Sequence, residues 1–253
     1  MTFDVAAQAY DQFMGRFSEP LAIGFADFTG VRAGQRALDV GCGPGALTAR
    51  LVERLGADGV SAVDPSTSFV AALAERLPEV DVHAGAAEDL PFGDSVFDVV
   101  ACQLVVHFMA DPLAGLREMR RVCRPGGTVA ACVWRRSGLG VGPLTTFWQA
   151  VGDLNPSATG EDARPGTGEG ELARLMVEAG LRDTVATLLT VSVRFETFAQ
   201  WWEPYTFGVG PAGEYVKALD DAGCEAVRAR CEDLLPPAPF EVSGSAWAVR
   251  AHA

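Results

Sequence analysis

Lysine and histidine are scarce in this sequence, which argues against two common kinds of enzyme site. Lys217 is the one lysine among 253 residues, so no Tyr-x-x-x-Lys pair of a nicotinamide-dependent oxidoreductase is present. None of the three histidines, at positions 83, 107 and 252, has a metal-ligating partner at a suitable spacing. The six cysteines include no Cys-x-x-Cys pair. We therefore expect no metal ion, and reduced cysteines that serve mostly as small apolar residues.

Long apolar runs and an excess of basic residues are also missing. Charged residues or glycines interrupt each apolar run before the roughly 18 residues that a transmembrane helix needs. Residues 1–10 contain Asp4 and no basic residue, unlike a secretory signal, so we expect a cytoplasmic protein. The net charge of −13, from 33 acidic and 20 basic side chains, would repel a nucleic-acid backbone. These absences favour a small-molecule partner over a nucleic acid or a membrane, and leave monomer and homodimer open.

Short apolar runs alternate with amphipathic segments over about 100 residues of the chain. The predicted strands cover 36–40, 59–64, 80–83, 97–102 and 128–134, and the segments 46–55, 66–77 and 113–123 have a helical period. This alternation predicts a Rossmann-like, doubly wound α/β sheet with helices on both faces. A chain of 253 residues with 49% hydrophobic content is long enough for one such core.

The remaining segments are predicted to add a lid and a cap to this core. Apolar residues between 3 and 17 recur with a helical period, and Ser18-Glu19-Pro20 is expected to end that helix. Further strands are predicted at 184–195 and 240–252. We therefore expect one domain over 1–253, with a lid helix in 1–20, a cofactor-binding core in 35–134, and variable insertions at 135–170 and 197–235.

Three glycines, Gly41, Gly43 and Gly45, follow the first predicted strand where the chain turns into a helix. Each removes a side chain that would keep a ligand away from the main-chain amides. The third glycine follows the second by two residues, so the dinucleotide fingerprint Gly-x-Gly-x-x-Gly is not met. Asp39 precedes the loop at the carboxyl edge of the sheet, where an acid favours a cationic ligand over a phosphate. The alternative role for Asp39 is to cap a helix or to accept a loop amide.

Asp64 ends the second predicted strand and is followed by Pro65 and Ser66. A carboxylate at this point can accept both hydroxyls of a ribose, in a nucleotide or in an S-adenosyl cofactor. Asp64 alone therefore does not distinguish the two cofactor classes.

Several segments in series resemble the class I S-adenosylmethionine-dependent methyltransferases, in particular their type 11-like small-molecule group. They are Ala37-Leu38-Asp39-Val40-Gly41-Cys42-Gly43-Pro44-Gly45, Val63-Asp64-Pro65-Ser66, Ala87-Glu88-Asp89-Leu90-Pro91-Phe92, Phe97-Asp98-Val99-Val100 and the stretch from Leu116 to Thr128. Residues 10–18 also resemble an N-terminal helix that covers the cofactor in a bacterial subgroup. The resemblance implies a seven-stranded sheet, mostly parallel with an antiparallel last strand, and a helical cap. One departure is Ala86, because relatives usually carry an acid there.

The resemblance also implies S-adenosyl-L-methionine as cofactor, with S-adenosyl-L-homocysteine as product. Asp39 would face the amino acid end of the cofactor, Asp64 would hold the ribose, and Gln103 would lie near the methionine portion. The expected cofactor residues are Tyr10, Arg16, Asp39, Gly41, Cys42, Gly43, Gly45, Asp64, Pro65, Ser66, Ala87, Glu88 and Gln103.

Two further sets of residues are candidates for the methyl acceptor's side of the site. His107, just after the fourth predicted strand, is the candidate general base if the acceptor has to lose a proton, although a histidine at this position is more often a packing or capping residue. Aromatic residues after the fifth strand are expected to line an apolar acceptor pocket or to form the core of the cap: Trp134, Trp148, Trp201, Trp202 and Tyr205.

The main functional prediction is methyl transfer from S-adenosylmethionine to a small molecule by in-line displacement, with the acceptor and the methylated atom open. One alternative is an NAD(P)-dependent Rossmann oxidoreductase, and another is a protein that binds S-adenosylmethionine without turnover. A DNA methyltransferase would usually show a Pro-Pro-aromatic segment after the fourth strand, where this chain has Cys102-Gln103-Leu104-Val105.

Overall fold

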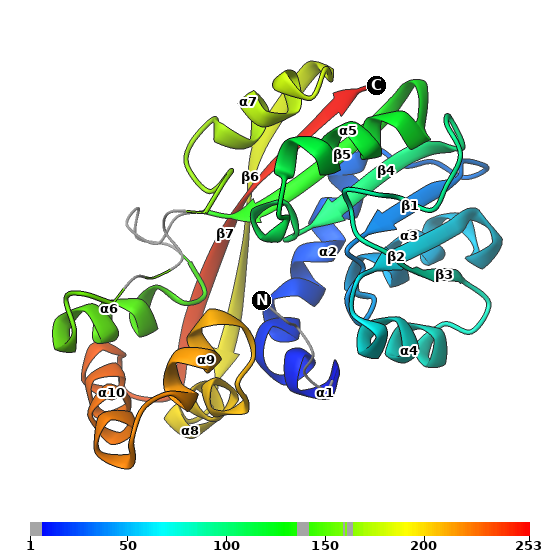
Figure 1. The fold of residues 1–253 in the computed structure, drawn as a ribbon. Helices are drawn as coiled ribbons and strands as arrows, with labels where there is room; N and C mark the ends of the chain where they lie inside the picture. The colour runs from blue at the N-terminus through cyan, green and yellow to red at the C-terminus, as the bar shows by residue number, and fades with distance from the viewer. Residues whose placement is uncertain (1–6, 136–141, 159, 161–163) are drawn as a thin grey trace.

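The computed structural model describes residues 7–135, 142–158, 160 and 164–253. Seven strands form one sheet in the order β3-β2-β1-β4-β5-β7-β6 (Figure 1). Neighbours from β3 to β5 are parallel, whereas β7 is antiparallel to both β5 and β6. The predicted Rossmann-like fold class is therefore confirmed. The strands are β1 (Ala37–Val40), β2 (Val60–Asp64), β3 (Asp81–Ala84), β4 (Phe97–Gln103), β5 (Cys123–Trp134), β6 (Arg182–Phe195) and β7 (Phe240–His252).

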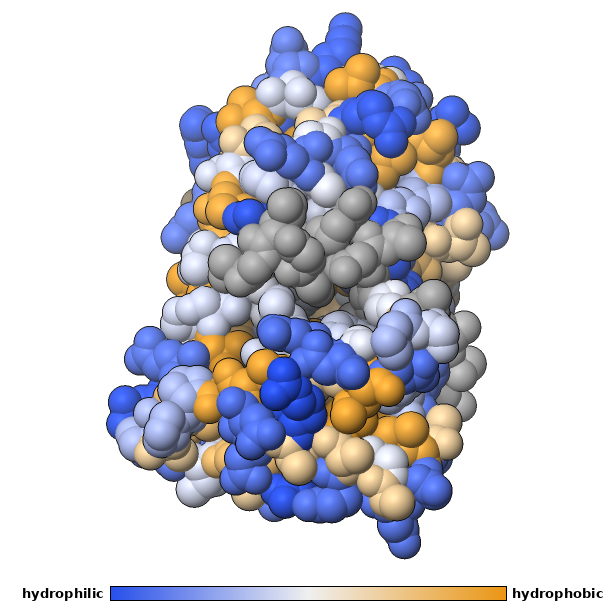
Figure 2. All heavy atoms as spheres, turned by 90° about the vertical axis from the view of Figure 1, so that its left-hand side faces the viewer, coloured by the Kyte–Doolittle hydropathy of each residue, from blue (hydrophilic) through white to orange (hydrophobic). Residues whose placement is uncertain are grey.

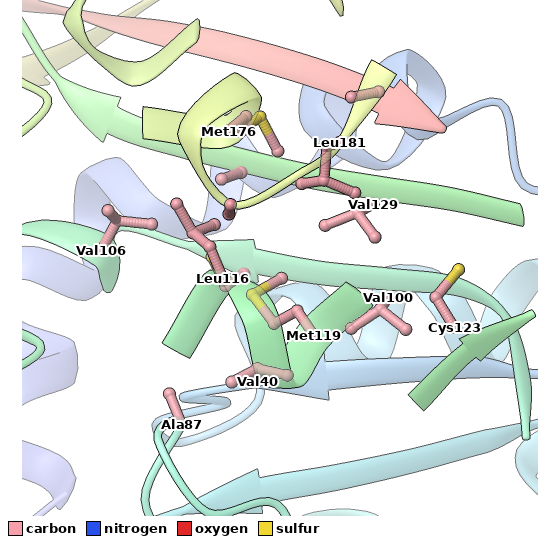
Figure 3. Close-up of a cluster of buried hydrophobic side chains, with 14 of the residues drawn as sticks. Val40, Ala87, Val100, Val106, Leu116, Met119, Cys123, Val129, Met176 and Leu181 are labelled. Carbon is pink, nitrogen blue, oxygen red and sulfur yellow. The ribbon is translucent and has the colours of Figure 1, made fainter. Parts of the chain in front are cut away.

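Helices cover both faces of this sheet, which explains why its central strands are almost wholly apolar. On one face α5 (Pro112–Val122) and α7 (Glu171–Glu178) close a core in which Leu116 and Met119 contact side chains of β1, β4 and β5 (Figure 3). On the other face lie α2 (Arg16–Thr29), α3 (Ala46–Leu55) and α4 (Thr67–Arg76). Each residue of β1 and β2 is buried, so the ends of these strands are held rigidly.

The N-terminal helix runs past the point where the sequence predicts its end. After α1 (Ala7–Tyr10) and a π-helical turn (Asp11–Gly15), α2 continues through Pro20 to Thr29 and ends at Gly30, which has a left-handed conformation. Proline normally breaks a helix, because it lacks an N–H and clashes with the preceding turn. Packing outweighs this local cost, since Leu21, Ala22, Phe25 and Ala26 are at most 1% exposed.

The fifth strand begins earlier than predicted, at Cys123 instead of residue 128. Its register against β4 jumps from Phe97↔Cys123 to Val99↔Thr128, so residues 124–127, which precede the predicted strand, form a bulge within the observed one. A side chain at Gly127 would lie 2.8 Å from the Asp98 carbonyl oxygen, so the bulge requires glycine there.

A helical cap lies between β6 and β7 in the chain and gathers at one end of the sheet (Figure 1). It consists of α8 (Phe198–Trp202), a 3-10 turn (Glu203–Phe207), α9 (Gly210–Lys217) and α10 (Asp221–Leu234), together with α6 (Thr145–Leu154) from the other insertion. These helices share an aromatic-rich core of their own. Phe195 and Phe240, paired at the ends of β6 and β7, stack with ring centroids 5.8 Å apart and close the base of the cap.

The outer surface carries its hydrophobic residues in small, separate patches on the side shown in Figure 2. The exposed large apolar side chains come from several different elements: Ile23, Leu154, Val177, Val185, Leu188 and Phe207. Within the described residues, no helix is both long enough and apolar enough to cross a membrane.

Replacing Pro20 tests how much stability the helix-breaking proline costs inside α2. We expect Pro20→Ala to raise the free energy of unfolding by about 1 to 3 kcal/mol, because alanine restores the missing N–H and removes the clash. Pro112→Ala is the matched control, since Pro112 stands in the first turn of α5, where proline is favourable. Urea unfolding measures both variants. Equal effects of the two substitutions would contradict this account of α2.

Candidate functional site

A cavity of about 550 Å³ opens at the carboxyl ends of the parallel strands. Residues that follow or end β1, β2, β3, β4 and β5 all reach its wall, and α1, the π-helical turn and the start of α9 close it from other sides. Doubly wound folds bind ligands at this edge of the sheet. The described wall consists of Tyr10, Phe13, Met14, Gly41, Gly43, Asp64, Pro65, Ser66, Thr67, Phe69, Ala86, Ala87, Glu88, Gln103, Leu104, Val105, His107, Phe108, Met109, Ala110, Trp134, Leu144, Val209, Gly210, Pro211 and Ala212.

The glycine-rich loop forms one part of this wall. Gly41 and Gly43 have positive φ angles of 70° and 53°, and both line the cavity. A side chain at Gly41 would come within 2.4 Å of Val105, whereas the space beside Gly43 holds no atom within 4 Å. The loop therefore needs glycine at 41 for packing, and at 43 it leaves the backbone open to a ligand.

Asp64 connects this loop to the end of β2. Its Oδ2 accepts a hydrogen bond of 2.9 Å from the Gly43 amide, and its Oδ1 accepts one of 2.8 Å from the Ser66 amide. Burial raises the pKa of the Asp64 carboxyl, and the two amide hydrogen bonds oppose that rise. Ser66 in turn caps α4, accepting from the Phe69 amide.

Asp39 lies behind the loop, completely buried and away from the cavity wall. Its Oδ2 accepts from the Thr48 hydroxyl at 2.6 Å, and its Oδ1 has no partner among the described residues. Burial raises the pKa of the Asp39 carboxyl to about 7, and the neighbouring charge of Asp64 contributes to the rise. A buried carboxylate with an unused oxygen is suited to a cationic or hydrogen-bond-donating group, directly or through water.

Gln103 and Glu88 hold two other parts of the wall together. Gln103 Nε2 donates to the Ser18 carbonyl oxygen at 3.0 Å, which joins the end of β4 to α2. Glu88 Oε1 accepts from the Ala110 amide at 2.8 Å and so fixes the segment after β4. Ala87 belongs to both the cavity wall and the core drawn in Figure 3, so this wall is backed by packed side chains.

His107 follows β4 in a 3-10 turn (Val106–Phe108) and lines the cavity while being 7% exposed. Arg164 donates to the His107 carbonyl oxygen at 3.2 Å, and its guanidinium lies 4.5 Å from the Phe108 ring centroid. Burial, and then the charge of Arg164, lower the pKa of His107 to about 3. The imidazole is therefore neutral near pH 7, and it is a weak base for any proton transfer.

Several predicted site residues lie away from this cavity. Arg16 points toward the cap, where it donates to the Gln200 carbonyl oxygen and lies over the Phe195 ring. Cys42 and Gly45 are in the loop but not on the cavity wall. Four of the five predicted pocket aromatics also lie outside the wall, in or against the aromatic core of the cap: Trp148, Trp201, Trp202 and Tyr205. Trp134 alone of that set lines the cavity.

The structure also adds wall residues that the sequence analysis did not single out. Phe13 and Met14 come from the π-helical turn, whose helical period was visible in the sequence, although its orientation was not. The segment 209–212 enters from α9, and a Val-Gly-Pro-Ala sequence carries no signal of a ligand site. Within the part of the chain that the structure describes, His, Cys, Asp and Glu side chains form no group of three that could hold a metal ion.

Known proteins that resemble this chain in sequence or fold are methyltransferases or are described as such in most cases. Residues 38–131 match the family model described as a methyltransferase domain. An uncharacterized methyltransferase of Mycobacterium tuberculosis is 37% identical over 153 residues, which cover 60% of this chain and 59% of that protein. A demethylmenaquinone methyltransferase of Beutenbergia cavernae is 42% identical over 103 residues, or 40% and 41% of the two chains. The solved YcgJ protein of Bacillus subtilis aligns with a TM-score of 0.59 and 18% identity, over 91% of this chain and 97% of that one.

Residues 38–131 are therefore similar to a methyltransferase domain, and the fold of the chain is that of solved S-adenosylmethionine-dependent methyltransferases. The sequence matches span less than two thirds of the length of these curated relatives. The segment that matches the family model includes the glycine-rich loop, Asp64 and the segment 86–88. S-adenosylmethionine, the cofactor of this family, carries two positive charges and a ribose. The Asp64 carboxylate on the cavity wall and the open space beside Gly43 fit such a group.

The raised pKa of Asp39 predicts a pH-dependent stability. The folded chain keeps this carboxyl protonated up to pH of about 7, whereas the unfolded chain ionises it near its ordinary value of 3.8. Between pH 4 and 7 the folded state therefore holds more protons, so the free energy of unfolding falls as pH rises, by up to about 4 kcal/mol. Asp39→Asn removes this loss.

We expect the unfolding free energy of Asp39→Asn, relative to wild type, to be distinctly larger at pH 8 than at pH 4.5, as measured by urea unfolding. Asp58→Asn, at an exposed position in the short turn Ala57–Gly59, is the control and should show no such trend. A difference between Asp39→Asn and wild type that stays constant across this range would refute the assignment.

Proposed function

We propose that this chain transfers a methyl group from S-adenosylmethionine to a small-molecule acceptor. The observation that carries the proposal is that the glycine-rich loop and Asp64 share one cavity with a largely apolar wall. The first two suit the donor, and the apolar wall suits a small organic acceptor.

The donor is proposed to lie along the ends of β1, β2 and β3. Asp64 would accept hydrogen bonds from the ribose hydroxyls, since it is the acid on the wall at the end of β2. Gly41 and Gly43 would bring their backbone close to the amino acid portion. Ala87 and Glu88 would lie beside the adenine, and backbone groups there would recognise it because Ala86 offers no carboxylate.

Pro65 and Ser66 extend the ribose subsite, while Gln103 faces the methionine portion from β4. Tyr10 closes this part of the cavity and packs edge-on against Phe69, with ring centroids 5.3 Å apart. Asp39 would act from behind the loop on the positively charged end of the donor. Of the predicted set, Arg16, Cys42 and Gly45 are given no direct contact with the cofactor.

The chemistry proposed is an in-line displacement. A lone pair or carbon nucleophile of the acceptor forms the bond to the methyl carbon, and the breaking carbon–sulfur bond leaves its electron pair on sulfur. Because the donor is already activated by its positive charge, the protein's tasks are alignment and exclusion of water. If the acceptor has to lose a proton, His107 is the candidate to receive it among the described wall residues, because Asp64 and Glu88 belong to the donor's side and Tyr10 stays protonated. Its lowered pKa makes it a weak proton acceptor in that role.

The first test is cofactor selectivity and its dependence on Asp64. We expect calorimetric titration to show binding of S-adenosylhomocysteine and none of NAD. Asp64→Ala should weaken S-adenosylhomocysteine binding about 10- to 100-fold, because a charged hydrogen-bond acceptor is lost. His107→Ala should change it much less, and Asp81→Ala, on the neighbouring strand, should not change it. Binding of NAD alone, or equal losses for Asp64→Ala and Asp81→Ala, would overturn the donor site.

Turnover is tested separately with a methyl-labelled donor and a fraction of small molecules from cell extract. Label transferred to an organic product by wild type and not by Asp64→Ala supports methyl transfer. Tight binding of S-adenosylhomocysteine without any transfer would favour the alternative of a binding protein without turnover.

A further inference from the structure

The sheet has two outer edges, and they differ in how well they are protected against pairing with a further strand. β3 forms one edge and β6 the other (Figure 1). An unpaired edge presents backbone N–H and C=O groups, and proteins usually keep such a strand short, charge it or cover it. β3 follows this rule, because it has four residues and begins with the exposed, acidic Asp81. β6 does not, since its 14 residues make it the longest strand of the sheet.

The central part of β6 lacks the features that prevent strand pairing. Residues 184–193 include no charged residue, no proline and no glycine. From Val185 to Phe195 the register with β7 is continuous, so no bulge bends the strand away. Apart from the pairing with β7, the backbone of β6 forms no hydrogen bond with another described residue. The outer edge of this stretch is therefore open to a further strand.

Two exposed apolar side chains lie on this strand, one on each face of the sheet. Val185 is 47% exposed and pairs with Arg250, whose guanidinium lies over the Phe28 ring of α2. Leu188 is 39% exposed and pairs with Trp247, which packs against the core closed by α5 and α7. Paired residues of antiparallel strands point to the same face, so Val185 lies on the α2 face and Leu188 on the α7 face. A strand added along β6 would cover apolar surface on both faces.

The charge distribution along β6 fits a second copy of the same chain. Each copy carries a net charge of −13, so most surfaces of two copies repel each other. At β6 the charged residues stand at the ends, and each end combines one arginine with one acid: Arg182 with Asp183, and Arg194 with Glu196. Two copies aligned antiparallel therefore bring an uncharged centre against an uncharged centre, and the ends that meet carry no net charge.

The symmetry and the size of such a contact also fit a second copy. A two-fold axis perpendicular to the sheet sets the two β6 strands antiparallel and pairs both open edges with each other. A strand of 14 residues is about 45 Å long, and a band about 20 Å wide along it, which includes the flanking parts of α2 and α7, covers roughly 900 Å². Each partner of a stable complex buries about 800 Å².

We propose that two copies of this chain associate through the outer edges of β6, in antiparallel orientation, and form one continuous sheet. The proposal goes beyond methyl transfer and does not rest on it. The paired edges lie on the far side of the sheet from β1, β2 and β3. Because the β3 edge is short and begins with an acid, the association is expected to stop at the dimer.

Analytical ultracentrifugation of wild type and two variants tests the association. We expect wild type at tens of micromolar to sediment as a dimer of the 26.7 kDa chain. Leu188→Lys should raise the dimer dissociation constant by about 100-fold or more, because each dimer loses two buried leucines and gains two like charges. Leu154→Lys is the matched control, since Leu154 is 48% exposed at the end of α6 in the cap. It should leave the constant unchanged.

Hydrogen exchange of wild type locates the surface without any variant. When the dimer is diluted to monomer, we expect the amides of residues 184–193 that point away from β7 to exchange about tenfold faster or more. The amides of β3, on the other edge, should exchange at the same rate in both states.

Several outcomes would overturn the proposal. One is a wild type that stays monomeric at every concentration, and another is a dimer whose residues 184–193 show no protection that depends on concentration. Equal weakening by Leu188→Lys and Leu154→Lys would place the interface elsewhere. Assemblies larger than a dimer would contradict the two-fold arrangement. A monomeric wild type in which residues 184–193 gain protection only in cell extract would assign this edge to a different protein.

Discussion

The two hydrogen bonds that the Asp64 carboxylate accepts from the backbone determine the shape of the site. They tie the glycine-rich loop after β1 to the turn after β2, so the two strand ends present one continuous surface to the cavity. Because β1 and β2 are buried on both faces, this junction cannot shift without disturbing the core. Asp39, directly behind the loop, adds a second buried acid and makes the region favourable for positive charge once Asp39 is ionised.

A second constraint comes from α2, which holds in place the π-helical turn that lines one side of the cavity. Its buried face packs against the sheet through Leu21 and Phe25, and its Ser18 carbonyl oxygen receives the Gln103 amide. The π-helical turn that carries Phe13 and Met14 is continuous with this anchored helix. The π-helical turn is thus positioned by the same sheet whose strand ends form the opposite part of the cavity wall.

Much of the core could be predicted from the sequence, because strand and helix periods in 35–134 directly reflect burial. The ends of β2, β4 and α5 fall within one or two residues of the predicted ones. Pro20 misled the prediction of the first helix, because a local signal was outweighed by tertiary packing. The aromatic residues of the cap could not be assigned, since the sequence shows that aromatic side chains gather in this segment but not against which neighbours Trp201 and Trp202 pack. The contact of Arg16 with Gln200 could not be predicted for the same reason, because the two residues are 184 positions apart in the sequence.

The stacked pair of Phe195 and Phe240 has a consequence for how this fold diversifies. Because β6 and β7 meet at this pair, the 44 residues between them form a closed loop whose entropy of closure depends only logarithmically on its length. Doubling such an insertion costs about 0.6 kcal/mol, far less than one altered core side chain. Cap helices can therefore be gained, lost or reshaped during evolution while the edge formed by β1, β2 and β3 stays fixed. The proposed donor site thus depends on β1, β2 and β3, whereas the segment between β6 and β7 is free to vary.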